Sequence, residues 1–402
     1  MSKEEYRISP TLIEQDPKKR LEVDLFGTKL PSPLILGSGT LVEKQEQMDP
    51  YLLAGAGAVV PRTTRKVMTR QVHPSPHLYQ TGHRGKEMML NAEWTGADIE
   101  YWRPNLERLA ETKQVIMSIS GRDIPGCIEV CKTLDQYHWP YLEINVGCAH
   151  SNSHHGFITR NGDHIRKLVD SIKSAGVQTP IAIKLGHSDL IVPLAEIAKE
   201  AGADAIVAIN TYGPLFDFDI GQGGVANPVL GIGGAKGGMS GKPLFNIALT
   251  DIAEISYQVG IPAIGCGGVS TAEDVIKMMM AGAAAVQIYT AAHVRGINAP
   301  QFFTQLNGNL IAYMDKKGIE TASLTNGKAL SLLSQETNLD PLIPEFHSEN
   351  CTGCQKCMSI CLPRALTGAK TKNVVIEESK CIGCGHCTSV CPTQALTMKE
   401  RN

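Results

Sequence analysis

A lone cysteine stands just after an apolar run in the middle of the chain, and its thiol could carry chemistry. Residues 141–155 read YLEINVGCAHSNSHH, so Cys148 follows the run and opens a loop rich in histidine. A cysteine in such a place can be an inert small residue, a ligand of a metal or cluster, or a group that transfers a proton. The other cysteines and the polar residues near Cys148 decide between these roles.

Eight further cysteines form two repeats near the C-terminus. Residues 351–361 read CTGCQKCMSIC and residues 381–391 read CIGCGHCTSVC, so both have the spacing C-x2-C-x2-C-x3-C. This spacing holds two [4Fe–4S] clusters, and the fourth cysteine of each repeat ligates the other cluster. We therefore predict one cluster on Cys351, Cys354, Cys357 and Cys391, and a second on Cys381, Cys384, Cys387 and Cys361.

Two structural zinc sites are the alternative, because two groups of four cysteines could also supply zinc ligands. The repeated spacing disfavours zinc. Two clusters in one module relay electrons and do not catalyse a reaction by themselves. Since the clusters account for eight thiolates, Cys148 is not needed as a ligand, which favours a chemical role for it.

Three polar side chains stand at the ends of consecutive apolar runs. Asn145 ends YLEINV, Lys184 lies within IAIKL, and Asn210 ends AIVAIN. A surface lysine is not expected inside an apolar run. We therefore predict that these three side chains point into one pocket.

These residues belong to a repeated pattern of short apolar runs separated by helical segments, for example at 166–173, 194–200 and 274–280. Eight such alternations predict an α/β fold, a (β/α)8 TIM barrel, with the site at the carboxyl ends of its strands. An open doubly wound sheet is the alternative, but GSGT at 37–40 does not match its glycine fingerprint. The runs cover residues 33–37, 57–61, 115–120, 141–146, 181–185, 205–210, 261–268 and 284–290.

The seventh run predicts a phosphate site. It ends in Gly267 and Gly268, and a helical segment then begins with SerThrAlaGluAsp at 270–274. Bare backbone N–H groups at a helix start bind anions, and barrels hold phosphate beside strands seven and eight. A flavin fits this site, because it converts the single electrons of the clusters into a two-electron reaction. Lys184 would then stabilise the negative charge of the reduced ring.

Composition and charge exclude several classes of protein. The 402 residues carry a net charge of −2, which gives no reason to expect a nucleic acid partner. MSKEEYRISP has no signal-peptide core, and no apolar run is long enough to predict a membrane span. We expect a cytoplasmic protein with the barrel at 1–320, a linker at 321–345 and a ferredoxin-like domain at 346–402. Small strands are predicted near 374–376 and 395–398.

The chain resembles the dihydroorotate dehydrogenase superfamily of FMN enzymes along essentially its whole length. With its ferredoxin-like tail it most resembles the FMN- and cluster-bearing subunit of bacterial NAD-dependent dihydropyrimidine dehydrogenase. The markers are SGT after the first run, MLNAE at 89–93, NVGC at 145–148, the lysine of AIKL, INT at 209–211, GGMSG at 237–241, and the late CGG and YT.

This resemblance implies roles for individual residues. Cys148 falls on the family's proton-transferring cysteine, and His150 stands where the pyrimidine enzymes carry a histidine. The substrate would meet Asn91, Glu93, Asn145, His150, Asn210 and Thr211, and asparagine amides suit the alternating N–H and C=O edge of a pyrimidine. FMN would contact Gly37, Ser38, Arg62, Thr63, Asn145, Lys184, Gly241, Cys266, Gly267, Gly268, Tyr289 and Thr290.

The chain departs from the family pattern at several positions. The family usually reads Ser-Cys-Pro at the catalytic cysteine, whereas residues 147–149 read Gly-Cys-Ala. The second strand usually ends in Lys-Thr or Lys-Ser, whereas residues 62–63 are Arg-Thr. The histidine-rich loop at 150–155 and the basic stretch at 83–86 are either solvated segments or signs of an anionic substrate other than uracil or thymine.

The resemblance implies reduction of an activated C=C bond, uracil or thymine to the 5,6-dihydro form, or the reverse reaction. FMN would supply hydride to one carbon and Cys148 a proton to the other, since a thiol with an ordinary pKa of about 8.5 is protonated at neutral pH. The chain has no NAD or FAD fingerprint, so a partner subunit with FAD and NAD(P) would feed the clusters. We also expect an oligomer.

Other functions stay open at this stage. One is a dihydroorotate dehydrogenase-like enzyme, although Asn91-x-Glu93, His150 and the fused tail favour the pyrimidine branch. Another is an enoate-type reductase of a different anionic substrate. A third is a tRNA dihydrouridine synthase-like enzyme, which shares the FMN barrel and cysteine motif but normally has a basic surface and a helical RNA-binding domain. A simple electron carrier would not need asparagines around a cysteine.

Overall fold

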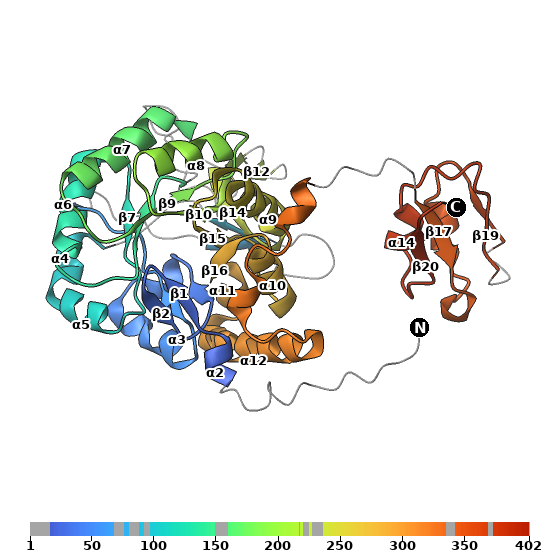
Figure 1. Ribbon diagram of the computed structural model, residues 1–402, viewed down its shortest axis with the longest axis horizontal. Helices are drawn as coiled ribbons and strands as arrows, with labels where there is room; N and C mark the ends of the chain where they lie inside the picture. Colours follow the sequence, from blue (N-terminus) through green and yellow to red (C-terminus); the bar gives the residue numbers. More distant parts are fainter. Residues whose placement is uncertain are drawn as a thin grey trace. The chain divides into compact units, whose positions relative to one another are not determined.

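The computed structural model describes residues 17–67, 76–79, 88–91, 97–148, 160–216, 218–219, 225–226, 236–334, 342–368 and 373–401. The chain divides into two compact units, Met1–Leu333 and Ser334–Asn402 (Figure 1). The first unit contains the predicted strand–helix repeats, and the second contains the two cysteine repeats.

Eight parallel strands form the centre of the first unit, and each overlaps one of the predicted apolar runs. Backbone bridges join Val59 to Val115 and Thr64 to Ile119, so the first and last strands of the sheet meet and close it into a barrel. The prediction of a (β/α)8 barrel is confirmed, and the open sheet is excluded. In spatial order the strands are β4 (Ala58–Val59), β3 (Leu34–Leu36), β16 (Ala283–Ile288), β15 (Ala263–Cys266), β10 (Ala205–Ala208), β9 (Ile181–Leu185), β8 (Leu142–Asn145) and β7 (Ser118–Ser120).

The barrel strands are apolar because both faces of the sheet are covered. Every residue of β9 and β10 is buried, as expected for parallel strands with helices outside and side chains filling the inside. The predicted helical segments fall within three of the outer helices (Figure 1). The longer outer helices are α6 (Ile124–Leu134), α7 (Gly162–Ser174), α8 (Ile191–Glu200), α9 (Phe245–Glu254), α10 (Ala272–Met280) and α12 (Ala299–Lys317).

Shorter elements complete this unit. A hairpin of β1 (Val23–Leu25) and β2 (Thr28–Leu30) precedes the first barrel strand. The short helix α11 (Thr290–His293) follows the last barrel strand. In the parts of the chain that the structure describes, no helix is both long and apolar enough to cross a bilayer.

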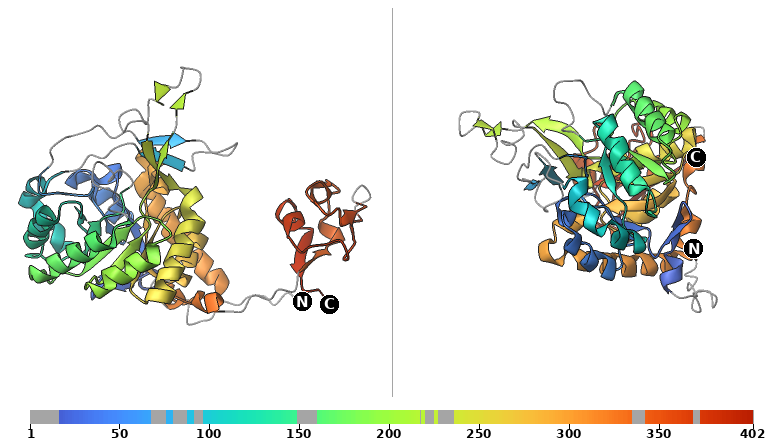
Figure 2. Two further views of the ribbon diagram at one scale, coloured as in Figure 1. Left: turned by 90° about the horizontal axis from the view of Figure 1, so that it is seen from above. Right: turned by 90° about the vertical axis from the view of Figure 1, so that its left-hand side faces the viewer.

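A second sheet, which the sequence did not reveal, grows from the loops after β4 and β10. It is antiparallel and contains β11 (Tyr212–Phe216), β14 (Lys236–Gly241), β6 (Met88–Asn91) and β5 (Pro76–Tyr79), in that order. Because both loops leave the carboxyl ends of barrel strands, the sheet lies at that face of the barrel (Figure 2). Its central strand KGGMSG has no apolar run, and it pairs with β6 about 150 residues away, so local pattern could not predict it.

The second unit is built on the two cysteine repeats. Each repeat contains one helical turn, α13 (Lys356–Ser359) or α14 (His386–Ser389). Two small antiparallel pairs flank them, β17 (Ile343–Phe346) with β20 (Leu396–Lys399) and β18 (Leu366–Thr367) with β19 (Val375–Ile376). The strands predicted near 374–376 and 395–398 are therefore present.

Candidate active site

A cavity of about 380 Å³ opens where the barrel strands end. This is an ordinary volume for a site that binds a cofactor or small molecule. Its wall includes Cys148, Asn210 and Thr211 from the predicted substrate side. The wall also includes all the positions predicted to contact FMN: Gly37, Ser38, Arg62, Thr63, Asn145, Lys184, Gly241, Cys266, Gly267, Gly268, Tyr289 and Thr290.

Of the remaining predicted substrate residues, the structure describes only Asn91. Asn91 ends β6, where its backbone pairs with Gly238 on β14, the strand that leads to Gly241. Glu93 and His150 lie outside the described residues, as do the loop at 150–155 and the basic stretch at 83–86.

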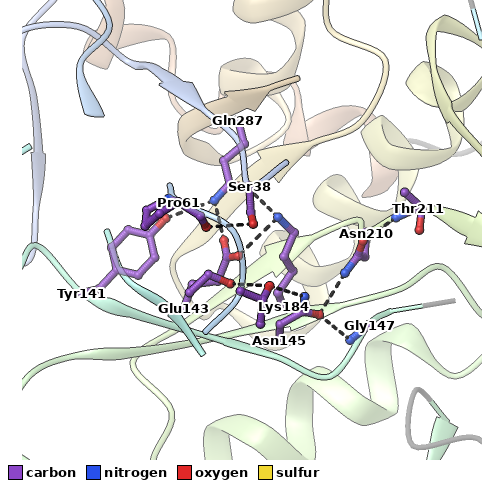
Figure 3. Close-up of polar contacts among 12 residues, drawn as sticks. Ser38, Pro61, Tyr141, Glu143, Asn145, Gly147, Lys184, Asn210, Thr211 and Gln287 are labelled. Atoms are coloured by element: carbon purple, nitrogen blue, oxygen red, sulfur yellow. Dashed lines mark hydrogen bonds and ion pairs between the residues drawn. The ribbon is translucent and has the colours of Figure 1, made fainter. Parts of the chain in front are cut away.

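Two asparagine amides are oriented by a chain of hydrogen bonds across the strand ends (Figure 3). Asn210 donates its Nδ2 to Asn145 Oδ1 at 2.9 Å, and Asn145 donates its Nδ2 to Thr63 Oγ1 at 3.1 Å. The backbone N–H of Gly147 also donates to Asn145 Oδ1, at 3.2 Å. An amide nitrogen carries two N–H groups, and these bonds use one on each side chain. Within the described residues, the second N–H of each makes no further hydrogen bond and can reach the carbonyl of a ligand.

The segment before Cys148 packs backbone against backbone. A Cβ added at Gly147 would lie 2.6 Å from the backbone N of Gly186 and from the carbonyl carbon of Leu185. The glycine at this position, where the family usually has serine, therefore lets the loop after β8 approach the loop after β9. Cys148 follows with a partly exposed thiol that lines the cavity.

Two arginines lie within electrostatic reach of the Cys148 thiol. Burial lowers the pKa of Arg62, whereas Tyr289, Glu43 and the Cys148 sulfur raise it. Burial lowers the pKa of Arg65 to about 10, and the Cys148 sulfur again acts in the opposite direction. Since an arginine side chain keeps its proton in proteins, both guanidinium groups bring positive charge to the cavity. The sequence predicted Arg62 but missed Arg65, because no motif marks it.

A buried polar triangle lies at the base of the cavity. Lys184 Nζ donates to Gln287 Oε1 at 2.7 Å and lies 3.4 Å from Glu143 Oε1. Burial lowers the pKa of Lys184, but the charge and the hydrogen bond of Glu143 oppose this, and the pKa is raised. Lys184 was predicted, whereas Glu143 and Gln287 were missed. The sequence did contain a signal for both missed residues, because each is a polar residue inside an apolar run.

The glycine pair after β15 is required by backbone geometry. Gly268 has φ +70°, and a Cβ there would lie 2.5 Å from the backbone N of Phe245 on α9. Gly267 has φ +131° and packs against Ala248 of the same helix. Side chains other than glycine would be strained at these angles. The pair thus brings bare backbone to the cavity wall, as predicted for a phosphate site.

The helix start that follows differs from the prediction. The backbone N–H groups of Ser270 and Thr271 donate to the Asp274 carboxylate, both at 3.0 Å, and Lys242 Nζ binds the same carboxylate at 2.7 Å. These two N–H groups are therefore not bare, and of the segment predicted to bind an anion the backbone of the glycine pair remains. The spacing Thr-x-x-Asp, a capping box, was the sequence signal that should have warned of it.

The wall of the cavity fits a phosphate-bearing flavin. Among the described residues that line it there are five cationic side chains and no carboxylate. A Cβ at Gly39 would overlap the Tyr289 ring, which shows how closely the loop after β3 approaches it. Positive charge, bare glycine backbone and directed amides together suit a phosphate and a heteroaromatic ring. The cations are Arg62, Arg65, Lys184, Lys242 and Arg295.

In the second unit, the cavity lined by the first cysteine repeat also receives a cysteine of the second repeat. Cys351, Cys354 and Cys357 of the first repeat line one small cavity together with Cys391 of the second. Backbone N–H groups of Ala365 and Ala395 donate to the sulfurs of Cys361 and Cys391, both at 3.2 Å. Bonds of this kind stabilise thiolate ligands and raise the potential of a cluster.

Fold and site together define a flavin-type barrel enzyme fused to an iron–sulfur module. The family model described as dihydroorotate dehydrogenase matches residues 20–314, and the chain belongs to this family. A model described as a 4Fe-4S dicluster domain matches residues 344–398. The cofactors are therefore FMN and two [4Fe–4S] clusters, and the zinc alternative is excluded. The chain is an oxidoreductase that acts on CH–CH bonds.

Individual relatives support this assignment. The chain is similar to the catalytic subunit of dihydroorotate dehydrogenase B (NAD(+)) from Methanosarcina acetivorans, with 31% identity over 73% of this chain and 91% of the relative. It is also 31% identical to dihydroorotate dehydrogenase A (fumarate) from Limosilactobacillus reuteri, over 75% of this chain and 96% of the relative. The dihydroorotate dehydrogenase of Eimeria tenella, solved with ferulenol, shares the fold at a TM-score of 0.58 and 18% identity, over 78% of this chain and 89% of that structure.

The names of these relatives test the family and the branch that the sequence predicted. The superfamily is confirmed. The relatives named above are dihydroorotate dehydrogenases and not dihydropyrimidine dehydrogenases, so the choice of the pyrimidine branch rests on Asn91-x-Glu93, His150 and the fused iron–sulfur tail.

Proposed function

We propose that this chain is the catalytic subunit of an FMN- and iron–sulfur-dependent oxidoreductase that interconverts a neutral pyrimidine, uracil or thymine, and its 5,6-dihydro form. The observation that carries the proposal is the meeting of Cys148, Asn145 and Asn210 at one cavity. A thiol that can move a proton then lies beside two amides that can bind the polar edge of the ring. Uracil and thymine are the substrates that this arrangement suits best.

The proposed chemistry divides between the cofactor and the chain. When bound, FMN supplies hydride transfer at one carbon of the double bond and single-electron exchange with the clusters. Cys148 holds the proton that is added to, or taken from, the neighbouring carbon. The second N–H groups of Asn145 and Asn210 would donate to the ring carbonyl and stabilise the negative charge that develops on its oxygen.

The other residues of the cavity would hold FMN. Backbone around Gly267 and Gly268, together with Thr290 at the start of α11, would bind its phosphate. Lys184 would place a positive charge beside the ring, where reduction adds negative charge. Loss of these contacts should therefore weaken retention of the flavin before it affects proton transfer.

The electron route would extend to a second subunit. The Methanosarcina relative is named a catalytic subunit of an NAD(+)-linked enzyme, which fits a partner that carries FAD and NAD(P). Such a partner would exchange electrons with the two clusters, and the clusters with FMN. Purified chain that turns over NAD(P)H by itself would contradict this part of the proposal.

A second candidate is dihydroorotate, or another anionic substrate as in enoate-type reductases. The observation in its favour is Arg65, which adds a cation to the wall of the cavity near Cys148. A carboxylate on the substrate would pair with this guanidinium. The names of the relatives point the same way.

An anaerobic assay separates the candidates. The reduced protein is mixed in turn with uracil, thymine, orotate and an open-chain unsaturated acid, and reoxidation of the flavin is followed by its absorbance. We expect uracil or thymine to reoxidise it. Reaction with orotate alone would replace the proposal by the second candidate, and reaction with the open-chain acid alone would refute a pyrimidine substrate.

Arg65→Gln provides the matched control for substrate charge. A charge-assisted contact contributes about 1.5–3 kcal/mol, or about 10- to 100-fold in kcat/KM. The variant should lose this much with an anionic substrate. With a neutral pyrimidine, which has no carboxylate to pair with Arg65, the loss in kcat/KM should be severalfold smaller.

A further inference from the structure

Glu143 is a buried carboxylate inside the barrel that the chemistry above leaves without a role. Its side chain is 0% exposed, and that of Lys184 beside it is 6% exposed. A carboxylate in such a place is costly unless it is paired and hydrogen-bonded. Its partners therefore indicate what it does.

The carboxylate sets the direction of the Gln287 amide (Figure 3). Gln287 donates its Nε2 to Glu143 Oε2 at 2.6 Å and also faces the Tyr141 hydroxyl at 3.4 Å. With its nitrogen held on that side, the amide must turn its oxygen toward Lys184, whose Nζ donates to it at 2.7 Å. Glu143 thus directs the lysine through Gln287.

Two of these residues line the cavity, and the third lies behind them. Lys184 on β9 and Gln287 on β16 both line the cavity, whereas Glu143 on β8 is not part of its wall. Glu143 therefore acts from behind, through the residues that line the cavity. It is a positioning residue and would not touch a ligand.

The carboxylate is also the counter-charge of Lys184. Among the described residues, Glu143, Gln287 and Cys266 face the lysine, and its neighbours on β8 and β10 are the uncharged Asn145 and Val207. Burial raises the pKa of the Cys266 thiol, so this group stays neutral. Burial also lowers the pKa of Lys184, and the effect is overcome chiefly by the Glu143 charge.

We propose that Glu143 aims Lys184 into the flavin cavity through Gln287 and keeps this lysine protonated, so that Glu143 sets the reduction potential of the bound FMN. A positive charge beside the ring favours the reduced, negatively charged flavin and raises its potential. Without Glu143, burial would release the proton of Lys184 at neutral and alkaline pH, and the potential would fall. At acidic pH the lysine would regain its proton, with no carboxylate to offset it, and the potential would rise.

The test is the midpoint potential of FMN in the purified holoenzyme, measured by spectroelectrochemistry across mildly acidic to mildly alkaline pH without substrate. Glu143→Gln should have a lower potential than wild type at alkaline pH, close to that of Lys184→Gln. It should equal or exceed wild type at acidic pH. The pH-dependent effect of E143Q requires Lys184, so it should vanish in a protein that already carries K184Q. The potentials of E143Q/K184Q and of K184Q should therefore differ by the same amount at every pH.

Asp204→Asn is the matched control. It also removes a carboxylate that pairs with a lysine, Lys173 at 2.7 Å, but at the opposite end of the barrel. Its potential should follow that of wild type at every pH. If the potential of E143Q follows that of wild type in parallel across the pH range while K184Q is shifted, the role of Glu143 is wrong. The role of Lys184 would still stand.

Two further outcomes are informative. If E143Q does not yield folded, flavin-loaded protein, Gln287→Met removes the hydrogen bonds that join Glu143 to Lys184 and keeps both charges. The potential of this variant should fall below that of wild type. An unchanged potential would overturn the inference. If K184Q leaves the potential unchanged, both this inference and the proposed FMN contact at Lys184 are wrong. Because no substrate is used, neither result depends on which ring the enzyme reduces.

Discussion

At the scale of single residues, the setting of Cys148 argues for a chemical role. The residue before it is a glycine because a Cβ would overlap the backbone at 185–186. The thiol that follows lines the same cavity as Asn145 and Asn210 and lies within electrostatic reach of two arginines. An inert cysteine would need none of these features.

We expect Cys148→Ala to retain the absorbance of FMN and of the clusters and to lose about 10²- to 10⁴-fold in turnover, the usual contribution of a general acid or base. Steady-state assays with the best substrate measure the loss. Cys127→Ala is the control, because this thiol is buried on α6, away from the cavity. Unchanged turnover in Cys148→Ala would remove the residue from the mechanism.

At the scale of elements, loops that leave the barrel strands must pass close to neighbouring helices. The glycine pair after β15 passes against α9 with positive φ angles, and Asp274 ties the start of α10 to Lys242 after β14. Two separate elements are thereby fixed at the end of the cavity that we assign to phosphate. Changes there should affect stability and flavin retention together.

Gly268→Ala tests this geometry. The left-handed backbone costs about 1–2 kcal/mol for a residue with a Cβ, and overlap with Phe245 adds to it. We expect lower thermal stability and less bound FMN. Gly308→Ala is the matched change: it lies in α12 with open space around it, so it should stabilise the protein by up to about 1 kcal/mol. A Gly268→Ala protein as stable and flavin-loaded as wild type would contradict the packing argument.

At the scale of the whole molecule, the chain joins a catalytic unit to an electron-transfer unit. The second unit, Ser334–Asn402, has only a small apolar core, which includes Cys357 and Cys387. If the repeats exchange their fourth cysteines as predicted, one cluster joins segments about 34–40 residues apart and the other joins segments about 20–26 residues apart, so both contribute to the folding of this unit.

Cys391→Ala and Cys361→Ala should therefore damage opposite clusters. Each variant should lose about half of the iron, and electron paramagnetic resonance should show a different cluster remaining in each. FMN should still be reduced by the dihydro substrate, whereas electron passage beyond the barrel should slow. Loss of the same cluster in both variants would refute the crossed ligand assignment.

Much of this protein follows from sequence alone, because the relevant signals are local. Continuous apolar runs predicted every barrel strand, since parallel strands are buried on both faces. Cysteine spacing predicted the module with two [4Fe–4S] clusters, since short spacers let neighbouring thiolates surround one cluster. The ends of the runs predicted the wall of the cavity, since a barrel brings all its carboxyl strand ends to one face.

Tertiary structure alone decided the features that depend on distant pairs. The sheet of β5, β6, β11 and β14 joins segments about 150 residues apart, and its glycine-rich strand has no periodicity to detect. Glu143, Lys184 and Gln287 each interrupt an apolar run, but only closure of the barrel brings β8, β9 and β16 near enough to hydrogen-bond. Sequence thus determined which strands form and which residues end them, whereas the closed barrel determined which buried charges meet, because charge pairing depends on distances in space.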